Sequence, residues 1–290
     1  MPELPEVETI ARGLASRVTG DVIESVWLGS KPEPLKSAAS EIVATLESKR
    51  IAGVRRVGKH IVFDLQNGGR ASSPVRKRSS RTSKKEQPTN PSITAQWIVH
   101  LGMTGRMLVC KSEAELEKHT HAVARLASGR ELRFVDPRRF GRLSVTQGFA
   151  AAGSEPLEVD SDRFVELFRG RKTPIKSALL NQKLLSGVGN IYADESLFRA
   201  GIRPRRRAAS LTRKELSQLY ATVQEVLREA IAAGGSSISN YVDADGEEGF
   251  FQFQHRVYGR ENAPCLVCKT PIKRIVIAGR SGHYCPRCQK

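Results

Sequence analysis

The chain has 290 residues, of which 39% are hydrophobic, and this is enough for two domains with buried cores. No apolar run is long enough to span a membrane, and the acidic, proline-containing start does not match a secretory signal, so we expect a soluble intracellular protein without a membrane partner. The 47 basic and 30 acidic residues give a formal charge of +17, which favours a polyanionic partner, nucleic acid ahead of an anionic membrane surface.

The N-terminal segment carries a potential nucleophile. If the initiator methionine is removed, the ring nitrogen of Pro2 becomes a free secondary amine, and α-amino groups have pKa values of about 7.7 to 8.0. The carboxylates of Glu3 and Glu6 lie close to it in the sequence. Pro5 suits the first turn of a helix, and an apolar stripe follows at helical spacing, formed by Val7, Ile10, Ala11 and Leu14. An ordinary amphipathic helix preceded by a proline is the alternative interpretation.

Short β-rich segments fill the first half of the chain. They cover residues 21–27, 50–57, 61–65, 95–101, 106–110, 122–126 and 131–135. Gly129 and Arg130 predict a hairpin turn before the last of these strands, and the whole series predicts an antiparallel β-sandwich or barrel with flanking helices. Residues 70–94 are rich in Ser, Arg, Lys, Pro and Asn, and we expect a disordered basic insertion there.

Helical periodicity replaces this pattern in the second half of the chain. A long helix is predicted after Thr212 and Glu215, which can form a capping box, and it ends at Gly234. Before it, residues 179–185 predict a helix end, residues 186–189 a tight turn, and Asn190 the N-cap of the next helix. Two helices joined by a glycine turn are a common DNA-binding device and also a common packing unit. The predicted fold class is therefore α+β with more than one domain.

Four cysteines near the C-terminus have the spacing of a zinc site. Cys265 and Cys268 are separated by two residues, and Cys285 and Cys288 repeat this spacing further on, as in a four-cysteine zinc ribbon. Disulfides are the alternative, and a reducing compartment disfavours them. The cysteine pairs would flank a hairpin with a strand over 272–278 and a turn over 279–282, which places Arg280 at an exposed tip. We expect one structural Zn2+ per chain.

Five further residues suit contact with nucleic acid. Asn190 at a helix start favours an anion, and Lys59 lies at the start of an apolar strand. Arg138 and Phe140 project on the same side if their segment is extended, so that one side chain reads a base while the other wedges into the stack. Met103 lies between glycines and is either an exposed wedge or part of the core. The alternatives are simple helix capping for Asn190, a solvated side chain for Lys59 and, for Arg138 and Phe140, a turn with the phenylalanine in the core.

Several motifs occur in an order that resembles formamidopyrimidine-DNA glycosylase, the bacterial bifunctional repair enzyme for oxidised purines. They are PELPEVET at 2–9, HLGMTG at 100–105, DPRRFG at 136–141, GVGNIYADE at 187–195 and the four-cysteine finger that ends the chain. The resemblance implies a catalytic β-sandwich domain over 1–152, a helix-two-turn-helix domain over 153–236, a lesion-covering loop over 237–254 and a zinc finger over 255–290, with DNA between them. The insertion at 70–94 and the linker at 153–157 depart from the family pattern.

The resemblance also implies a role for each matching residue. Pro2 would attack C1′ of the damaged nucleotide and form an imine, Glu3 would donate and accept protons, and Glu6 would orient the sugar. Lys59 completes the catalytic set. Contacts with DNA are implied for Lys59, His121, Arg138, Asn190 and Arg280. The residues that fill the stack left by a flipped nucleotide would be Met103, Arg138 and Phe140, with Arg138 facing the orphaned cytosine.

The implied function is removal of 8-oxoguanine and formamidopyrimidines from duplex DNA, followed by β,δ-elimination at the abasic site. We expect a monomer that acts on double-stranded DNA containing an oxidised base, in the bacterial cytoplasm and associated with the nucleoid. One alternative is the sister branch of glycosylases for oxidised pyrimidines, which usually has glycine where this chain has Leu4. The other is a noncatalytic, zinc-containing protein that binds damaged DNA.

Overall fold

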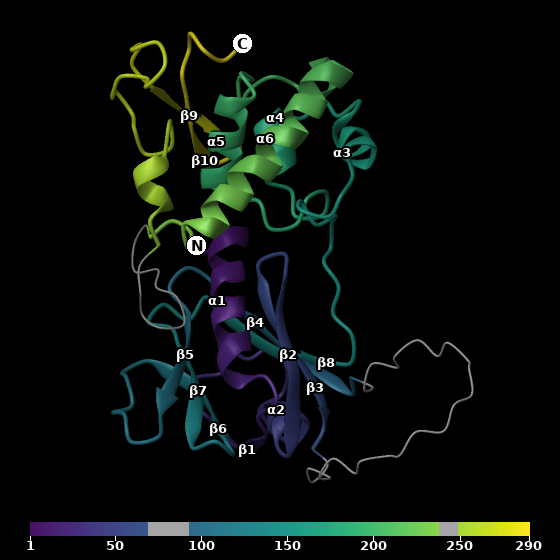
Figure 1. Cartoon of the computed structure of the whole chain (residues 1–290), viewed down its shortest axis with the longest axis vertical. Helices are drawn as coiled ribbons and strands as arrows, with labels where there is room; N and C mark the ends of the chain where they lie inside the picture. Colours follow the sequence, from purple (N-terminus) through teal and green to yellow (C-terminus); the bar gives the residue numbers. More distant parts are fainter. Residues whose placement is uncertain (69–92, 238–248) are drawn as a thin grey trace, which may run out of the picture. The chain divides into compact units, whose positions relative to one another are not determined.

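The computed structural model describes residues 1–68, 93–237 and 249–290 (Figure 1). Most of the basic insertion expected at 70–94 and most of the loop expected at 237–254 lie outside the described residues. The chain divides into two compact units. The helical unit contains Met1–Ile10, Arg56–His60 and Ala150–Lys290, and the β unit contains Ala11–Arg55 and Ile61–Phe149. In the part of the chain that the structure describes, no helix is both long and apolar enough to cross a membrane.

Two four-stranded sheets form the β unit, with strand orders β1-β6-β7-β5 and β2-β3-β4-β8. Their bounds are β1 Ile23–Leu28, β2 Lys49–Val57, β3 His60–Asn67, β4 Ala95–His100, β5 Arg106–Lys111, β6 Thr120–Leu126, β7 Arg130–Val135 and β8 Arg142–Thr146. Pairing is antiparallel between β1 and β6, β6 and β7, β5 and β7, and β4 and β8. β2 and β3 are joined by two residues, a connection that only antiparallel neighbours allow.

Buried aromatic side chains hold the β unit together. The rings of Phe63 on β3 and Trp97 on β4 stack with their centroids 5.0 Å apart. Phe134 on β7 packs closely against Gly141, the residue before β8, so the two sheets contact each other there. The predicted antiparallel β-sandwich is confirmed. The prediction lacks two elements, β8 and helix α2 (Ala39–Leu46), and the N-cap of α2, Ala38, offers no side-chain capping signal.

Helix α1 (Leu4–Val18) begins directly after the first three residues, with Pro5 in its first turn as predicted. Its buried stripe is formed by Leu4, Val7, Ile10, Ala11, Leu14 and Val18. The backbone amide of Leu4 donates a hydrogen bond to the carbonyl of Gly187 at 3.1 Å. The start of the chain is therefore fixed to a segment from its second half.

The helical unit carries the remaining elements, which confirms the predicted change of pattern. Their bounds are α3 Ser161–Phe168, α4 Ile175–Leu179, α5 Asn190–Arg199, η1 Ala208–Ser210, α6 Arg213–Ala232, η2 Phe251–Gln254, β9 Lys273–Ile277 and β10 Arg280–Tyr284. The capping box of Thr212 and Glu215 at the start of α6 is present as predicted. After α6, Gly234 has a φ of 74°, a backbone conformation that favours glycine and ends the helix.

The segment between α4 and α5 differs from the prediction. α4 ends at Leu179, and residues 181–185 form turns instead of the end of a helix. The side chain of Gln182 explains this difference, because its Nε2 donates to the carbonyl of Val188 at 2.9 Å and its Oε1 accepts from the amide of Gly187, also at 2.9 Å. A side chain that bonds to later backbone groups stabilises the turns in place of another helical turn.

The start of α5 is also shifted by one residue. The N-cap is Gly189, so Asn190 is the first helical residue and not the N-cap. Glycine is required at 189 because a Cβ atom there would overlap the carboxylate of Glu3. At Gly187, where φ is 100°, a Cβ would lie 2.8 Å from the side chain of Leu4. The glycines of this turn therefore make room for the N-terminal residues.

The C-terminal hairpin has a shorter turn than predicted. β9 and β10 pair in antiparallel fashion, and Arg280 is already paired with Ile277. The turn consists of Ala278 and Gly279, with φ values of 47° and 77°, and two positive φ values match the twist of a two-residue hairpin. The side chain of Arg280 is exposed, as expected, although it belongs to β10 and not to the turn.

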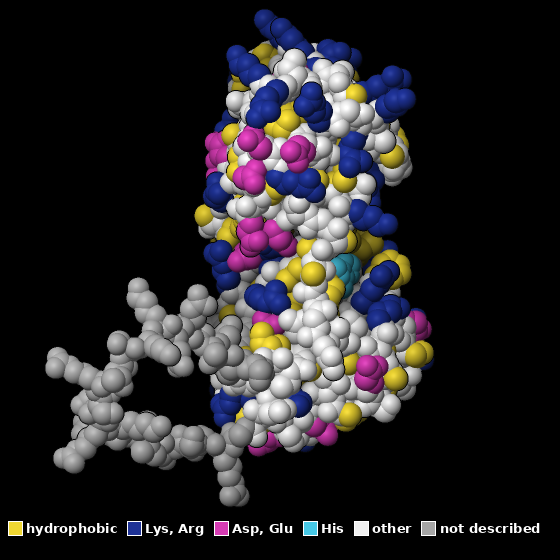
Figure 2. All heavy atoms as spheres, turned by 90° about the vertical axis from the view of Figure 1, so that its right-hand side faces the viewer, with side chains coloured by type: hydrophobic (Ala, Val, Ile, Leu, Met, Phe, Trp, Pro, Cys, Tyr) yellow, Lys and Arg dark blue, Asp and Glu magenta, His cyan; other side chains and the backbone are white. Residues whose placement is uncertain are grey.

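Basic side chains are spread over the surface. Figure 2 shows Lys and Arg groups distributed over one face, with Asp and Glu groups between them. The segment 203–207 alone contributes Arg203, Arg205 and Arg207 as exposed side chains. The positive charge of the sequence is therefore accessible to a polyanion.

Candidate active site and metal centre

Two carboxylates are buried at the start of α1. Glu3 and Glu6 are 4% and 2% exposed. The backbone amide of Glu3 donates to Oε2 of Glu6 at 2.7 Å, so Glu6 caps the first turn as the acidic member of a capping box does. Pro2 precedes this pair and is half-buried. The predicted nucleophile thus adjoins two carboxylates whose positions are fixed.

The two carboxylates differ in their hydrogen bonds. Glu6 accepts from at least three groups, namely the hydroxyl of Tyr192 and the amides of Glu3 and Ser236, the last at 2.8 Å. Oε1 of Glu3 accepts from the amide of Ile191 at 3.1 Å. Oε2 of Glu3 has no hydrogen-bond partner among the residues that the structure describes. Glu3 is therefore the carboxyl group with an oxygen available to a ligand.

Burial raises the pKa of both carboxyl groups. The pKa of Glu3 rises to about 7, a shift that the ammonium group of Lys59 opposes and the carboxylate of Glu6 increases. Burial also raises the pKa of Glu6, and the hydrogen bonds from Tyr192 and Ser236 oppose that shift. Neighbouring carboxyl groups in different surroundings divide the roles of acid and base between them. Glu3, with fewer donors, is placed to carry a proton at neutral pH.

Lys59 lies in the turn between β2 and β3, which an ion pair holds in place. Glu155 accepts from the amide of Gly58 at 2.5 Å and from the guanidinium of Arg56 at 2.7 Å. Burial lowers the pKa of Lys59, and the carboxylate of Glu3 opposes this shift. The turn therefore brings the Lys59 ammonium within electrostatic reach of Glu3.

Asn190 and Arg280 come together at the start of α5. Nδ2 of Asn190 donates to Oγ of Ser281, the residue after Arg280, at 3.2 Å. Burial and the nearby charge of Arg280 both lower the pKa of Lys59. The structure thus gathers three of the residues expected to contact DNA, Lys59, Asn190 and Arg280, in one part of the helical unit.

A buried ion pair that the sequence did not reveal supports this cluster. Nζ of Lys176 on α4 lies 2.6 Å from Oδ1 of Asp194 on α5, and both side chains are fully buried. Lys176 also donates to the carbonyl of Ser281 at 2.5 Å, and Asp194 accepts from the amide of His283 at 2.8 Å. Buried charges are tolerated when they are paired and hydrogen-bonded in this way. The pair fixes β10, and with it Arg280, on α5.

Glu195 attaches a further segment to α5. Its carboxylate accepts from the backbone amides of Arg256, Val257 and Tyr258 at 2.9, 3.0 and 2.8 Å. Three converging amides compensate for the burial of a charge. α5 therefore contacts the N-terminus, β10 and the segment before the metal centre.

A second set of predicted residues lies on two turns of the β unit. Met103 and Phe140 are 43% and 52% exposed, so neither is part of the core. Cζ of Arg138 lies 4.7 Å from the centre of the Phe140 ring, in a cation–π contact. Arg139, between them, has a φ of 57°, so this segment turns and is not extended as predicted. Arg138 and Phe140 nevertheless form one exposed stack.

Asp136 holds these turns together. Its carboxylate accepts from the hydroxyl of Thr104 at 2.6 Å and from the amides of Arg138 and Gly141 at 3.2 and 2.7 Å. Nε2 of the buried His121 lies 2.9 Å from the carbonyl oxygen of Asp136. His121 therefore supports the turn from inside the β unit, and its direct contact with DNA stays a prediction.

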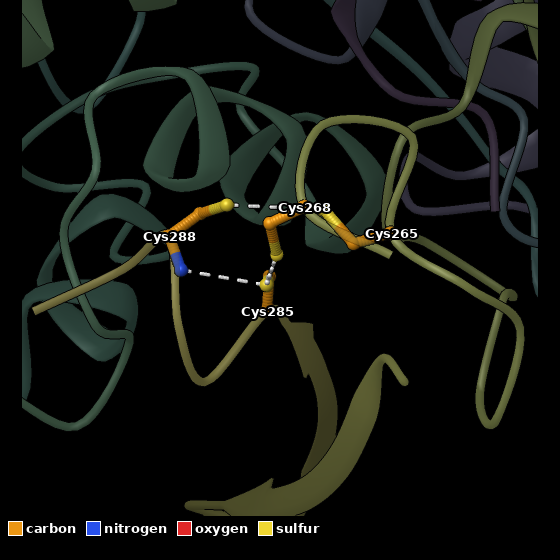
Figure 3. Close-up of side chains that lie close together, drawn as sticks. All are labelled: Cys265, Cys268, Cys285 and Cys288. Carbon is orange, nitrogen blue, oxygen red and sulfur yellow. Dashed lines mark hydrogen bonds between the residues drawn. The ribbon is translucent and has the colours of Figure 1, made fainter. Parts of the chain in front are cut away.

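The four C-terminal cysteines form a metal centre (Figure 3). The sulfur atoms of Cys265, Cys268, Cys285 and Cys288 all lie within 4.8 Å of one another. The Sγ atoms of Cys265 and Cys288 are 3.9 Å apart, and those of Cys268 and Cys285 are 3.4 Å apart. A disulfide would need about 2.05 Å. Tetrahedral zinc with Zn–S bonds of about 2.3 Å places its sulfurs about 3.8 Å apart, so this set fits one structural Zn2+, as predicted.

Domain models of one family match successive parts of the chain. The model of the formamidopyrimidine-DNA glycosylase N-terminal domain matches residues 1–143, and that of the formamidopyrimidine-DNA glycosylase H2TH domain matches residues 152–242. The model of the zinc finger found in FPG and IleRS matches residues 263–290. These matches have the same order as the motifs in the sequence.

Relatives match over the whole length. The formamidopyrimidine-DNA glycosylase of Solibacter usitatus is 42% identical over 300 residues, and the match covers 100% of both chains. An Fpg variant from Lactococcus lactis, solved with a Fapy-dG containing DNA, is 30% identical with a TM-score of 0.84 and 100% coverage of both chains. The MutM (Fpg) protein of Thermus thermophilus is 39% identical with a TM-score of 0.81, over 99% of this chain and 98% of that one. Sequence, fold and zinc centre agree, and the chain belongs to the formamidopyrimidine-DNA glycosylase family.

Proposed function

We propose that this protein is a base-excision repair DNA glycosylase with AP-lyase activity. It removes 8-oxoguanine and formamidopyrimidines from duplex DNA and then cleaves the strand. The observation that carries the proposal is the buried pair Glu3 and Glu6 directly after Pro2, in which Oε2 of Glu3 has no partner among the described residues. A relative solved with Fapy-dG containing DNA supports oxidised purines as the substrate class.

Pro2 supplies the nucleophile once Met1 has been removed. Its nitrogen forms a bond to C1′ and loses its proton while the bond between C1′ and the base breaks, and the base takes up a proton as it leaves. Glu3 protonates O4′ as the sugar ring opens, which gives a cationic imine. Loss of a proton from C2′ then expels the 3′ phosphate, and a second elimination expels the 5′ phosphate. Glu6 orients the sugar and takes part in these proton transfers.

Two groups of side chains bind the DNA in this proposal. The phosphate clamp, which binds phosphates around the damaged nucleotide, consists of Lys59, Asn190 and Arg280. A duplex hides C1′ from an amine, so the nucleotide must leave the stack, at an unstacking cost that inserted side chains offset in part. The inserted residues are Met103, Arg138 and Phe140. The exposed stack of Arg138 on Phe140 supports this role.

Cleavage of matched duplexes tests the substrate class. One duplex carries 8-oxoguanine opposite cytosine, and the other carries a dihydropyrimidine in the same sequence. We expect faster cleavage of the 8-oxoguanine duplex and a covalent adduct at Pro2 when borohydride is present. Faster cleavage of the dihydropyrimidine duplex would favour the sister branch of glycosylases. Binding of both duplexes without an adduct would favour a noncatalytic protein.

Removal of the zinc is expected to abolish DNA binding before it unfolds the β unit. The finger obtains its folding energy from the metal, and Arg280 lies on the hairpin between the two cysteine pairs. DNA affinity is measured by fluorescence anisotropy during chelation. Both tryptophans, Trp27 and Trp97, belong to the β unit, so tryptophan fluorescence reports its unfolding separately. Unchanged DNA binding by the metal-free protein would contradict this prediction.

The proposal extends to the setting of the reaction. We propose a monomer that acts on nucleoid DNA in the bacterial cytoplasm, because the full-length relatives are bacterial DNA glycosylases. The domain boundaries after residues 152, 236 and 254 are part of the same proposal. Sedimentation of the protein alone and with a short duplex would establish the number of chains per complex.

A further inference from the structure

Hydrogen bonds connect the residues on the two sides of the segment 238–248. We call residues 235–237 and 249–255 the clasp. The amide of Gly249 donates to Oγ of Ser237 at 2.8 Å, and the amide of Ser237 donates to Oε1 of Gln252 at 2.9 Å. Nε2 of His255 lies 3.0 Å from Oγ of Ser236. The clasp is therefore an ordered element built from hydrogen bonds among its own residues.

The clasp bonds directly to the carboxylate of Glu6. The amide of Ser236 donates to Oε1 of Glu6 at 2.8 Å. A Cβ on Gly235, where φ is 84°, would lie 2.9 Å from the same oxygen, so backbone packs against it without an intervening side chain. The hydroxyl of Tyr192 donates to that oxygen too and lies 3.4 Å from Oγ of Ser236. His255, Ser236 and Tyr192 thus form a continuous set of hydrogen-bonded groups that ends on Glu6.

This set is buried among aromatic rings. The ring of Phe251 lies 5.7 Å from that of Tyr192 and 5.6 Å from that of His255, measured between centroids. Burial lowers the pKa of His255 to about 4, so its ring is neutral at neutral pH. Burial and the nearby carboxylate of Glu6 raise the pKa of Tyr192, which therefore keeps its proton and acts as a donor. Neutral, hydrogen-bonded groups of this kind fix an orientation without adding a charge.

We infer that Tyr192 and His255 are positioning residues for Glu6. Tyr192 acts directly, by donating to Oε1, and His255 acts through Ser236, whose amide holds the same oxygen. This inference rests on the proposed function, in which Glu6 orients the sugar of a flipped nucleotide. If the Glu6 carboxylate were free to rotate, imine formation would be slower. The contacts between the phosphate clamp and the DNA phosphates would stay intact. The two effects can be measured separately.

The test compares the variants Tyr192→Phe and His255→Leu with the wild type. The single-turnover rate constant of adduct formation is measured by borohydride trapping on an abasic-site duplex. Affinity is measured on a duplex containing tetrahydrofuran, which cannot form an imine. Because small misplacements of reacting groups have large effects, we expect the rate constant to fall about tenfold or more for Tyr192→Phe and at least about threefold for His255→Leu. Affinity should change by less than about twofold, since the phosphate clamp is untouched.

Matched controls separate positioning from packing. Tyr220→Phe removes a hydroxyl from a tyrosine that packs on Phe164 of α3, at 5.4 Å between ring centroids. Ser236→Ala removes the hydroxyl that contacts His255 and should slow adduct formation as His255→Leu does. Its control, Ser196→Ala, removes a buried hydroxyl of α5 that has no partner among the described residues. Both controls, Tyr220→Phe and Ser196→Ala, should form the adduct at the wild-type rate. His255→Gln and Ser236→Thr, which keep a hydrogen-bonding group at each position, should restore most of the rate.

The pH profile gives a readout that a purely structural role would not change. The titratable and charged groups that face Glu6 are Glu3, Lys59 and Tyr192, with His255 behind Ser236. The hydrogen bond from the Tyr192 hydroxyl lowers the pKa of Glu6, so its loss should move the acid limb of the rate profile up by about one pH unit.

Three results overturn the inference. The first is a wild-type protein that traps no adduct, which overturns the proposed function as well. The second is an adduct that forms in Tyr192→Phe and His255→Leu at the wild-type rate, which leaves the proposed function intact. The third is an equal loss of rate and affinity in both variants, with an unshifted acid limb. If His255→Leu does not fold, Tyr192→Phe and Ser236→Ala carry the same comparison.

Discussion

Replacement of Pro2 by alanine is expected to lower the trapped adduct at least tenfold, while affinity for a tetrahydrofuran duplex changes by less than about threefold. The secondary amine of proline gives an imine that has no N–H proton to lose, so it stays cationic at every pH. The imine of a primary amine must be protonated before it can withdraw electrons for the two eliminations. Single-turnover trapping with borohydride measures the first effect, and fluorescence anisotropy measures the second.

The control for this substitution is Pro5→Ala. Pro5 lies in the first turn of the same helix, three residues away, and carries no free amine. Its adduct yield should stay within about twofold of the wild type, because the first turn tolerates either residue. Mass spectrometry of the N-terminus must accompany both measurements, since a retained Met1 turns the proline nitrogen into an amide and abolishes the adduct. Equal losses of trapping and binding in Pro2→Ala would make Pro2 a structural residue.

Replacement of Glu3 by glutamine is expected to slow base release by about 10² to 10⁴ and to change its pH dependence. Burial raises the pKa of Glu3 from 4.5 to about 7, so its protonated form predominates below pH 7 and is lost above it. If Glu3 must donate a proton, base release therefore slows about tenfold for each pH unit above this pKa. Glutamine does not titrate, and the alkaline limb should disappear. Single-turnover base release between pH 5.5 and 9 measures both effects.

Glu6→Gln provides the contrasting variant. Glu6 already accepts hydrogen bonds from Tyr192 and Ser236, and both oppose the rise that burial causes in its pKa. The rate should fall, and the alkaline limb should remain because Glu3 is still present. The opposite result is a wild-type rate that rises as the pH passes through 7, with no such rise in Glu3→Gln. It would show that Glu3 acts as a base and would refute its role as the acid.

Features that depend on neighbours in the sequence could be predicted. The stripe of α1, the capping box of Thr212 and Glu215 and the cysteine spacing all lie within short stretches, where helical period and ligand geometry limit the alternatives. The wrong predictions concern short segments in which a side-chain contact overrides the local preference of the backbone. Gln182 stabilises turns where helical propensity suggests a helix end, and the carboxylate of Glu3 requires glycine at 189.

The groups that support the site could not be predicted, because their partners are distant in the sequence. Tyr192 bonds to a residue 186 positions away, and the spacing of α5 shows only which face of that helix it lies on. Lys176 is a single lysine in an apolar context, and nothing near it in the chain indicates that Asp194 will neutralise it. Only the fold brings such pairs together. The carboxylates of Glu3 and Glu6 could be predicted as part of the site because they are close to Pro2 in the chain.

The distance along the chain between the two sides of the site has a consequence for biosynthesis. Glu3 is held by an amide 188 residues later, and Glu6 by an amide 230 residues later. At about 5 to 20 residues per second, a ribosome needs roughly 10 to 50 s to synthesise the chain between Glu6 and Ser236. The start of the chain spends that interval without its final partners, as an open chain end that a methionine-removing peptidase can reach. In the proposed mechanism, Met1 can therefore be removed and the Pro2 amine exposed before the site that encloses it has formed.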